Sequence, residues 1–228
     1  MSDARDAAKQ AVAAAAAARV PDGVRLGLGS GTTLALFVPA LAARVAAGLR
    51  VRCVPTSDHI AALATAAGLT IEDLGSEPLD LAIDGADEVD PAGQMVKGAG
   101  GALVRERIVA AAAPRFLVLI DESKLVEKLG DHMPLPVEIQ PFGAKRTARA
   151  VAALLGTAIL RAGPTGPFVS DNGGLILDCA IPRGHPPEDL ARELRALPGV
   201  VDTGFFLGFR PELLIGRPGR VDFVPRND

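Results

Sequence analysis

The chain has 228 residues, of which 49% are hydrophobic and 22% charged, and its net charge is -3. This length allows one large or two small domains with a substantial core. The weak charge argues against a nucleic-acid-binding protein, although it permits an anionic ligand where cations gather locally. No stretch approaches the apolar length of a membrane span, so we expect no membrane partner.

The N-terminal 20 residues predict an amphipathic helix rich in alanine. They open with mixed charge and have an alanine core, which argues against a signal peptide. Val24 to Leu28 reads as a buried strand. Gly29 to Thr33 then leads into an apolar helix, which we expect to be kinked or restarted at Pro39.

The next segment continues the alternation of strands and helices. Val51 to Val54 predicts a strand, and Ser57 or Asp58 is expected to cap a helix that runs through Ala67. A third strand, Leu79 to Ile83, ends at a loop crowded with carboxylates.

Residues 102–112 predict a helix, residues 116–120 a strand, and Ser123 the cap of a short helix. Strands that alternate with helices indicate βαβ units and a Rossmann-like, mostly parallel sheet. Ligands of such sheets bind at the carboxyl ends of the strands, where the glycine-rich and acidic loops are expected to lie.

The pattern changes after Pro134. The following residues predict a strand, a helix, a hairpin around Asn172-Gly173, a second helix and a strand near Val200. This order indicates a second, smaller α+β domain over residues 133–204. Residues 1–132 and 205–228 are expected to form the α/β domain, because strands near Leu213 and Val221 would return to it.

The glycine-rich loop has the sequence Gly-Ser-Gly-Thr-Thr, and its candidate ligand-binding residues are Ser30, Gly31, Thr32 and Thr33. A strand, such a loop and a helix present backbone N–H groups and hydroxyls to an anion. The loop lacks the lysine of a P-loop and the third glycine of a dinucleotide fingerprint. Tight packing is the other interpretation of these glycines.

The acidic loop begins with Asp84 and Asp87, and Gly85 and Ala86 leave space between them. Both aspartates could simply cap and turn the chain, while Glu88 and Asp90 are expected to meet solvent. That interpretation suits Asp84 less well, because Asp84 directly follows an apolar strand at the ligand edge of the sheet. Asp84 and Asp87 are therefore candidate reacting groups.

Glu106 is the strongest candidate for a catalytic base. It stands between two arginines on a helix whose other residues are apolar, and three consecutive charges spread over about 200° of a helix cannot share one solvated face. A carboxyl group turned into protein has a raised pKa, which makes it a useful base near neutral pH. The alternative is an ion pair with its neighbour at the surface.

Two lysines follow these acids. Lys97 could neutralise the acidic loop structurally, or could stabilise a negatively charged intermediate. Lys124 follows the strand that ends at Ile120, so it lies at the ligand edge and could bind a phosphate. An ordinary exposed lysine in a first helical turn is the alternative there.

Cysteine and histidine give no sign of a metal site. Cys53 and Cys179 each lie in an apolar segment, and the three histidines are isolated from one another. We therefore expect buried, reduced thiols in a cytoplasmic protein, no metal and no cofactor.

Taken together, these segments resemble ribose-5-phosphate isomerase of the A type. The resemblance covers nearly the whole chain, and its most specific block is DLAIDGADEVD followed by KGAGGALVRERI. GLGSGTT, DESKLVEKLG, PLPVEI, SDNGG and LPGVVDTGFF add to it. The departures are small, namely Val104, Arg107, Ala99 within the glycine run, and Pro39.

The resemblance implies an isomerase of ribose 5-phosphate and ribulose 5-phosphate that acts through a cis-enediolate. It implies that Glu106 is the base, that Asp84, Asp87 and Lys97 line the reacting end, and that Lys124 binds substrate. Gly98, Ala99 and Gly100 follow Lys97 and are expected to contact substrate with it. The family also implies a homodimer or a dimer of dimers, with exposed apolar surface on the smaller domain as its basis.

Two other functions are compatible with parts of the sequence. An amino-sugar-phosphate isomerase or deaminase would share the sheet architecture, and it would need a catalytic histidine near the loops, for which His59 is the nearby candidate. A sugar-phosphate-sensing module of a transcription regulator would need a DNA-binding segment. The N-terminal helix has little basic character, which argues against that segment.

Overall fold

The computed structural model describes residues 2–226 and divides the chain into two compact units. The first consists of Met1–Ala86, Arg105–Leu125 and Phe209–Asp228, and the second of Asp87–Val104 and Val126–Gly208. The second unit therefore takes in residues 87–104, 126–132 and 205–208, which the sequence pattern assigns to the first domain. A three-stranded sheet within the second unit accounts for residues 87–104 and 205–208. That each unit is an independently folding domain stays a prediction.

The first unit is built on a seven-stranded sheet of order β16-β15-β7-β4-β1-β2-β3. Every neighbouring pair is parallel except β15 and β16. The predicted mostly parallel sheet and the return of the C-terminal tail to it are both confirmed. The strands are β1 (Val24–Leu28), β2 (Val51–Pro55), β3 (Thr70–Ile71), β4 (Leu81–Gly85), β7 (Phe116–Asp121), β15 (Glu212–Arg217) and β16 (Arg220–Val224).

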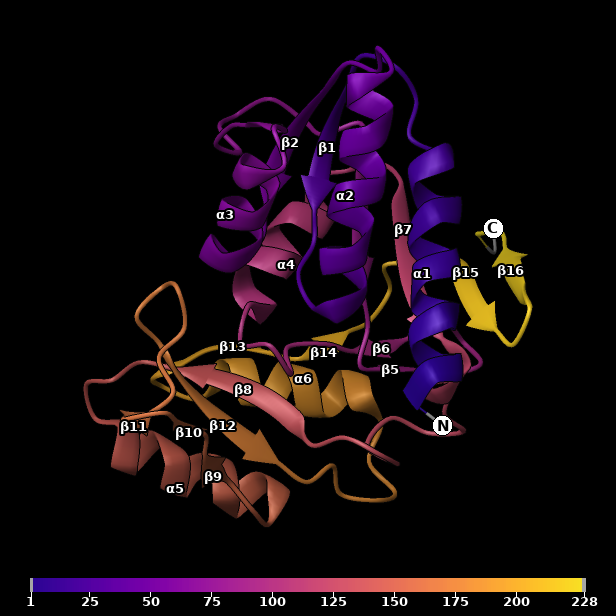
Figure 1. Cartoon of the computed structure of the whole chain (residues 1–228). Coiled ribbons are helices and arrows are strands. Elements are labelled where there is room, and N and C mark those ends of the chain that lie inside the picture. The colour runs from indigo at the N-terminus through magenta and orange to yellow at the C-terminus, as the bar shows by residue number, and fades with distance from the viewer. Residues whose placement is uncertain (1, 227–228) are drawn as a thin grey trace. The chain divides into compact units, whose positions relative to one another are not determined.

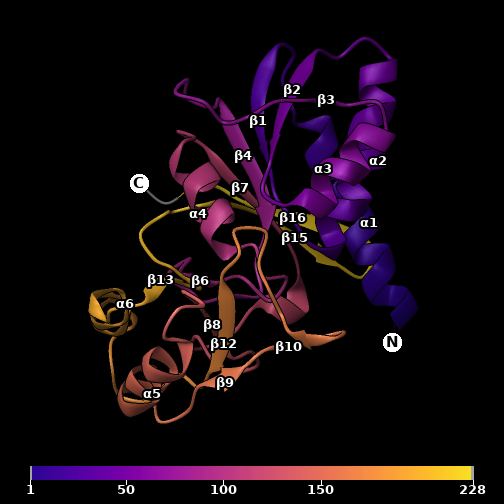
Figure 2. The same ribbon diagram turned by 90° about the vertical axis from the view of Figure 1, so that its left-hand side faces the viewer.

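Helices cover both faces of this sheet (Figure 2). The helices are α1 (Ser2–Ala18), α2 (Thr32–Ala46), α3 (Asp58–Ala66) and α4 (Leu103–Ala111), followed by the 3₁₀ turn η1 (Glu122–Lys124). On one face, α1 runs beside α2 and β15 (Figure 1). On the other face, α4 packs against Gly27 of β1, where an added Cβ would lie 2.4 Å from Cγ1 of Val109. Among residues 2–226, no helix combines the length and apolar character that crossing a bilayer requires.

The alanine content of α1 allows it to approach the sheet closely. Val12, Ala13, Ala16 and Ala17 are buried in the main core of this unit, and a Cβ on Gly216 of β15 would lie only 2.7 Å from the carbonyl oxygen of Ala8. Larger side chains on that face of α1 would push the helix away from the sheet. The predicted amphipathic helix is therefore confirmed, and its small residues are needed for packing.

The structure corrects two local predictions about helix positions and confirms a third. The helix α2 continues through Pro39 without restarting, because Phe37, Val38 and other buried residues hold it to the sheet on both sides of the proline. Of the two expected cap residues of α3, Ser57 and Asp58, the structure confirms Ser57, which accepts a hydrogen bond from the Ile60 N–H at 3.2 Å. At η1 the capping residue is Asp121, two residues before the expected Ser123.

The second unit holds a four-stranded antiparallel sheet of order β13-β8-β12-β9 and a three-stranded sheet of order β14-β6-β5. Its buried core combines the larger sheet with two strongly amphipathic helices. Its elements are β5 (Glu88–Val89), β6 (Met95–Val96), β8 (Leu135–Ile139), α5 (Ala144–Leu155), β9 (Ile159–Leu160), β10 (Ala162–Gly163), β11 (Gly166–Pro167), β12 (Leu175–Cys179), α6 (Pro187–Ala196), β13 (Val200–Thr203) and β14 (Phe205–Phe206).

The predicted α+β character of this unit is confirmed, but the predicted hairpin forms only in part. The chain does reverse at residues 171–174, where the Ser170 N–H donates a hydrogen bond of 2.8 Å to the Gly174 carbonyl. Only one bridge, between Val169 and Leu175, continues the pairing. Beyond it β12 pairs with β8 and β9 instead. The short strands β5, β6 and β14 carry no periodic signal, because a two-residue strand is too short to show alternation.

Candidate active site

The loop after β1 is tied to two neighbouring strands of the first unit. The backbone N–H of Ser30 donates to Oδ1 of Asp84 at 3.1 Å. The Ser30 hydroxyl lies 2.6 Å from the Thr56 hydroxyl and 2.8 Å from the Ser57 hydroxyl. Because Ser57 also caps α3, this hydroxyl cluster fixes the glycine-rich loop to the start of that helix.

Asp84 is a buried carboxylate at the end of β4, with 3% of its surface exposed. Its Oδ1 accepts hydrogen bonds from the N–H groups of Ser30 and, at 2.7 Å, Gly85. Gly29 lies against it, and a Cβ there would come within 2.1 Å of the Asp84 Cγ. Hydrogen bonds to buried charged groups compensate for the lost hydration, so the loop after β1 is shaped around this carboxylate. Only glycine fits at position 29 without displacing the Asp84 side chain.

The rest of the glycine-rich loop opens α2. Gly31 has a φ of 99°, which favours glycine, and it precedes the first turn of α2. Gly31 and Thr32 are exposed, whereas Thr33 is buried. The Lys9 ammonium donates to the Thr32 hydroxyl at 3.1 Å, which brings a positive charge to the start of the helix. Sequence reasoning missed Lys9, because the alanine-rich helix around it signals only packing.

Glu106 lies in the first turn of α4 and is 6% exposed. The arginines on either side each contact a residue outside this helix. Arg105 donates to Oδ1 of Asp58 at 2.7 Å, and the Arg107 guanidinium lies 5.9 Å from the ring centroid of Phe209. The burial of Glu106 confirms the expectation that the acid turns into protein and does not lie at the surface.

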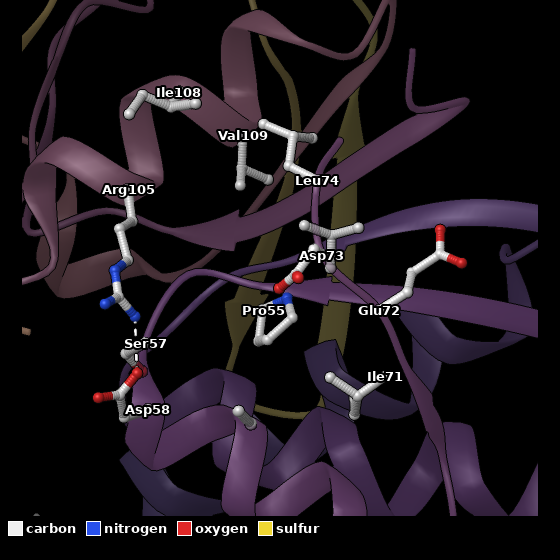
Figure 3. Close-up of a pocket in the computed structure, with 12 residues that line it drawn as sticks. Pro55, Ser57, Asp58, Ile71, Glu72, Asp73, Leu74, Arg105, Ile108 and Val109 are labelled. Carbon is white, nitrogen blue, oxygen red and sulfur yellow. Dashed lines mark hydrogen bonds and ion pairs between the residues drawn. The ribbon is translucent and has the colours of Figure 1, made fainter. Parts of the chain in front are cut away.

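A cavity of about 430 Å³ opens beside Arg105 in the same unit (Figure 3). Arg105 extends toward Ser57 and Asp58 at its rim. The acidic side chains of Glu72 and Asp73 also line it, together with apolar groups from β2, α3 and α4. None of the site residues predicted from the sequence lines this cavity, although its lining residue Ser57 lies 2.8 Å from the Ser30 hydroxyl.

Lys124 lies half-buried on η1, directly after β7. The turn is held by Asp121, whose side chain accepts hydrogen bonds from the Ser123 N–H and from the Arg5 guanidinium. Burial alone would raise the pKa of Asp121, but hydrogen bonds from these two residues together hold it below its usual range. An ionised Asp121 therefore fixes the turn that carries Lys124.

Lys97 belongs to the second unit, where it directly follows β6, and it is 2% exposed. Its ammonium lies 5.4 Å from the ring centroid of Phe206, at cation–π distance. Its backbone N–H donates to the Gly204 carbonyl at 2.9 Å. A Cβ on Gly204 would come within 2.4 Å of the Lys97 carbonyl oxygen, so the paired strands β6 and β14 closely constrain this lysine.

Asp87 is the first residue of the acidic loop that belongs to the second unit, and it is half-buried. Its Oδ2 accepts a hydrogen bond from the Ala99 N–H at 2.8 Å. Gly98 is buried with a φ of 103°, whereas Ala99 and Gly100 are exposed. Gly85 is half-buried and Ala86 buried, and these two residues join Asp84 to Asp87 along the chain.

Glu88 contradicts its prediction. It was expected to meet solvent, yet it is fully buried. Its carboxylate accepts hydrogen bonds from the backbone N–H groups of His132 at 2.6 Å, Met133 at 2.8 Å, and Gly130. These donors stand more than 40 residues later in the sequence, so no local pattern indicates them. Glu88 organises the chain before β8.

Asp90 also lies less exposed than expected. It is half-buried and accepts hydrogen bonds from the Ala92 and Gln94 N–H groups at 2.9 and 2.8 Å. Burial raises its pKa, against the lowering effect of these donors. Within residues 2–226, no three acidic, histidine or cysteine side chains gather in a metal-binding arrangement.

The structure thus brings predicted residues together within each unit. Asp84, Ser30 and Gly85 share hydrogen bonds in the first, and Asp87 and Ala99 share one in the second. The candidate catalytic acids and the candidate lysine are shielded from water to different degrees. Asp84, Glu106 and Lys97 are buried, and Asp87 is half-buried.

Comparisons with known proteins identify the family of this chain. A model of the family described as ribose 5-phosphate isomerase A (phosphoriboisomerase A) matches residues 52–220. Ribose-5-phosphate isomerase A of Agrobacterium fabrum is 47% identical over 90% of this chain and 92% of the relative. That of Thermomicrobium roseum is 47% identical over 96% of this chain and 94% of the relative.

Solved structures give the same result. Ribose 5-phosphate isomerase A from Methanocaldococcus jannaschii has a TM-score of 0.92 and 36% identity, covering 97% of this chain and all of that one (100%). A D-ribose-5-phosphate isomerase in complex with phospho-erythronic acid has a TM-score of 0.92 and 35% identity, covering 97% of this chain and 99% of that one. The chain is an isomerase and belongs to the ribose 5-phosphate isomerase A family.

Proposed function

We propose that this protein interconverts D-ribose 5-phosphate and D-ribulose 5-phosphate, a reaction of the non-oxidative pentose phosphate pathway. Family membership supports the reaction, and the burial of Glu106 on an otherwise largely apolar helix is the observation that carries it. The solved relative with phospho-erythronic acid adds support. That compound has a phosphate and a planar, negatively charged carboxylate, which resembles an enediolate.

The proposed chemistry is a proton transfer between adjacent carbons. After the ring opens, the Glu106 carboxylate takes the proton from C2, and the electron pair of that bond forms the C1–C2 double bond as the C1 carbonyl becomes an oxyanion. Glu106 then returns the proton to C1, and O2 becomes the carbonyl oxygen as its proton is passed to O1. The step needs no net oxidation and no cofactor.

Other charged groups are assigned the stabilisation of the oxyanion and the transfer of hydroxyl protons. In this proposal Lys97 stabilises the developing oxyanion, because a positive charge in a buried position acts with little screening by water. Asp84, with Asp87, moves hydroxyl protons during ring opening and between O1 and O2. The hydrogen bonds on one oxygen of each aspartate hold the carboxylates in place for this role.

Substrate binding is assigned to the loops that carry these groups. We assign the phosphate to Lys124 and to the loop that opens α2, where backbone N–H groups, hydroxyls and the nearby Lys9 favour an anion. The sugar hydroxyls are assigned to the residues around the aspartates and Lys97. The proposed binding residues are Ser30, Gly31, Thr32, Thr33, Asp84, Gly85, Ala86, Asp87, Lys97, Gly98, Ala99, Gly100 and Lys124.

An assay with ribose 5-phosphate in deuterated water tests the reaction directly. We expect formation of the ketose with solvent deuterium at C1, because a proton held by a carboxylate exchanges with water before it is returned. Mass spectrometry or NMR of the product locates the label. Failure to turn over ribose 5-phosphate would contradict the proposal, and label at C1 excludes a direct hydride shift.

Among the described residues, no observation favours either alternative function. A deaminase would release ammonia from an amino-sugar phosphate, and a coupled ammonia assay distinguishes it. His59, the candidate histidine for that reaction, is exposed next to the α3 cap. A sensor module would bind a sugar phosphate without converting it, which the same deuterium assay detects.

The proposal also covers the oligomeric state of the protein and its location in the cell. We propose a homodimer or a dimer of dimers, supported by the exposed apolar side chains of Ile159, Leu160 and Val169 in the second unit, which are 68%, 43% and 57% exposed. Light scattering coupled to size-exclusion chromatography measures the mass, and a monomer would contradict this part. A cytoplasmic location is supported by the two buried free cysteines, Cys53 and Cys179.

A further inference from the structure

Arg161 joins two parts of the second unit that are distant in sequence. It lies between β9 and β10, and its Nη1 donates to the carbonyl oxygens of Gly98 at 3.0 Å and Ala99 at 2.9 Å. The other side of its guanidinium holds the Asp178 carboxylate through Nε, at 3.0 Å, and through Nη2. One planar group therefore connects a strand of the sheet to the turn after Lys97.

The side chain of Arg161 is held in place on all sides. It is 14% exposed and lies 5.7 Å from the ring centroid of Phe168. Its backbone N–H donates to Ile176, and its carbonyl accepts from Phe168, both at 2.8 Å. Phe168 in turn packs on Gly101, where a Cβ would come within 2.3 Å of the ring. Such a constrained arginine positions its partners with little loss of conformational entropy.

A single peptide group links this arginine to Asp87. The carbonyl of Gly98 accepts from Arg161, and the N–H of the same peptide, on Ala99, donates to Oδ2 of Asp87 at 2.8 Å. A cation on the carbonyl and a carboxylate on the N–H polarise the peptide in the same direction. Hydrogen bonds in such a chain strengthen one another.

We propose that Arg161 is a positioning residue for the isomerisation. It acts through the Gly98–Ala99 peptide, which holds the carboxylate of Asp87 and the start of the turn behind Lys97. The inference rests on the proposed roles of Asp87 and Lys97. Arg161 itself is assigned no contact with the substrate, and Asp178 serves to anchor it.

Substitution of Arg161 separates this role from simple stabilisation. In Arg161→Met the side chain remains long and flexible but loses every donor. We expect kcat to fall by about tenfold to 10²-fold, as misplacement of a reacting group by about 1 Å does. We expect KM for ribose 5-phosphate to change by less than about threefold, because the proposed phosphate site lies on other loops. Circular dichroism confirms that the variant is folded before it is assayed.

Graded and control variants sharpen the test. Arg161→Lys keeps the charge but cannot bridge two carbonyls and a carboxylate in one plane, so it should recover only part of kcat. Asp178→Asn leaves Arg161 present with a weaker anchor and should cost less, which also keeps the test available if Arg161→Met fails to fold. The control is Arg195→Gln, which removes another Arg–Asp pair of this unit, with Asp202 at 2.9 Å, and should leave kcat unchanged.

A double-mutant cycle with Asp87→Asn gives the sharpest readout. If Arg161 works through Asp87, Arg161→Met should lower kcat far less in the Asp87→Asn background than in the wild type. A merely structural arginine would lower kcat by the same factor in both backgrounds. Equal factors, or an Arg161→Met enzyme with wild-type kcat, would overturn the inference.

Hydrogen exchange tests the same link without any turnover. The Ala99 amide should exchange faster in Arg161→Met than in the wild type and the Arg195→Gln control, because its bond to Asp87 loses support. Unchanged exchange would overturn the inference even where kcat falls. If wild-type protein does not convert ribose 5-phosphate, the proposed function fails, and exchange at Ala99 still decides whether Arg161 holds the turn.

Discussion

The two units secure their charged groups by different means. In the first unit, Asp84 is held by N–H groups at the ends of adjacent parallel strands, and it packs against Gly29. In the second unit, the turn after Lys97 is held by Arg161 and the chain before β8 by Glu88, each across more than 40 residues of sequence. Parallel strands place their loops at one edge by geometry alone, whereas the smaller antiparallel unit needs dedicated side chains.

Because of this difference, substitutions in the two units should affect the protein in different ways. Substitutions at the sheet edge of the first unit should act on the reaction through the reacting groups themselves. Substitutions of the bracing side chains in the second unit should affect stability or geometry over a wider region. The following variants test this difference between the two units.

The largest effect is expected for Glu106→Gln. Loss of the base should lower kcat by about 10²–10⁴-fold, since glutamine has nearly the same shape but cannot accept the C2 proton. Isothermal titration with a non-reacting sugar phosphate should show binding close to wild type. Glu193→Gln, an exposed substitution on α6, is the control. Near-normal turnover in Glu106→Gln would remove this residue from the base role.

Gly29→Ala should disturb Asp84 directly. The added Cβ would lie 2.1 Å from the Asp84 Cγ, so the carboxylate or the loop must move. We expect about 1–3 kcal/mol less stability from overpacking, and a loss of activity on the order of 10²-fold from the displaced carboxylate. Urea unfolding should show a smaller loss for Gly85→Ala, whose Cβ would meet its nearest neighbours at 3.6 Å. Equal losses would argue against the close packing of Gly29 on Asp84.

Glu88→Ala tests the bracing of the second unit. Three backbone N–H groups lose their acceptor, and each buried donor without a partner costs roughly 1–3 kcal/mol. Denaturant unfolding should therefore show a loss of at least about 3 kcal/mol. Glu127→Ala, at an exposed position of the same unit, should change stability little. Similar midpoints for the two variants would contradict the structural role of Glu88.

Lys124→Ala should weaken substrate binding with little change in kcat. A charge-assisted hydrogen bond to a phosphate contributes roughly 1.5–3 kcal/mol, so KM should rise by about tenfold or more. Steady-state kinetics measures the split, with Lys128→Ala at an exposed position as the control. A change confined to kcat would argue against phosphate anchoring.

The smallest effect concerns the buried thiols. Burial raises the pKa of Cys53, and likewise that of Cys179, to about 12 from 9.0, with a smaller contribution from a nearby carboxylate in each case. The folded thiols therefore stay protonated while unfolded thiols ionise. Their contribution to stability is complete below pH 9.0 and is lost as the pH rises toward 12. Thiol titration at a pH of about 8 should find both unreactive until denaturant is added, because the thiolate is the reactive form. Rapid reaction in native protein would contradict their burial.

Local sequence patterns are enough to identify much of the candidate site. Asp84 stands out because it follows an apolar run at the ligand edge of the sheet, and β4 indeed ends one residue later, at Gly85. Glu106 stands out because three successive charges cannot share one face of an apolar helix, and it is buried. Both inferences depend on the regular geometry of a single strand or helix, which repeats over a few residues.

Other features have no such local signal. The sequence pattern places Glu88 in solvent, whereas N–H groups of residues 130–133 replace its hydration in the fold. Arg161 and Lys9 do not stand out in the sequence, since their partners at Gly98 and Thr32 lie far along the chain. The predicted cap at η1 is Ser123, although Asp121 holds the turn.

Sequence patterns alone were enough to predict the alternation of strands and helices, the mostly parallel sheet of the first unit and the position of the acidic loop. These features could be predicted because the burial pattern of a strand or helix, and the residue types of a turn, involve residues that are close in sequence. The burial and pairing of other polar groups became known from the folded chain, as for Glu88 with residues 130–133 and Arg161 with the turn after Lys97. Those pairings depend on which distant segments the closed fold brings within hydrogen-bonding distance.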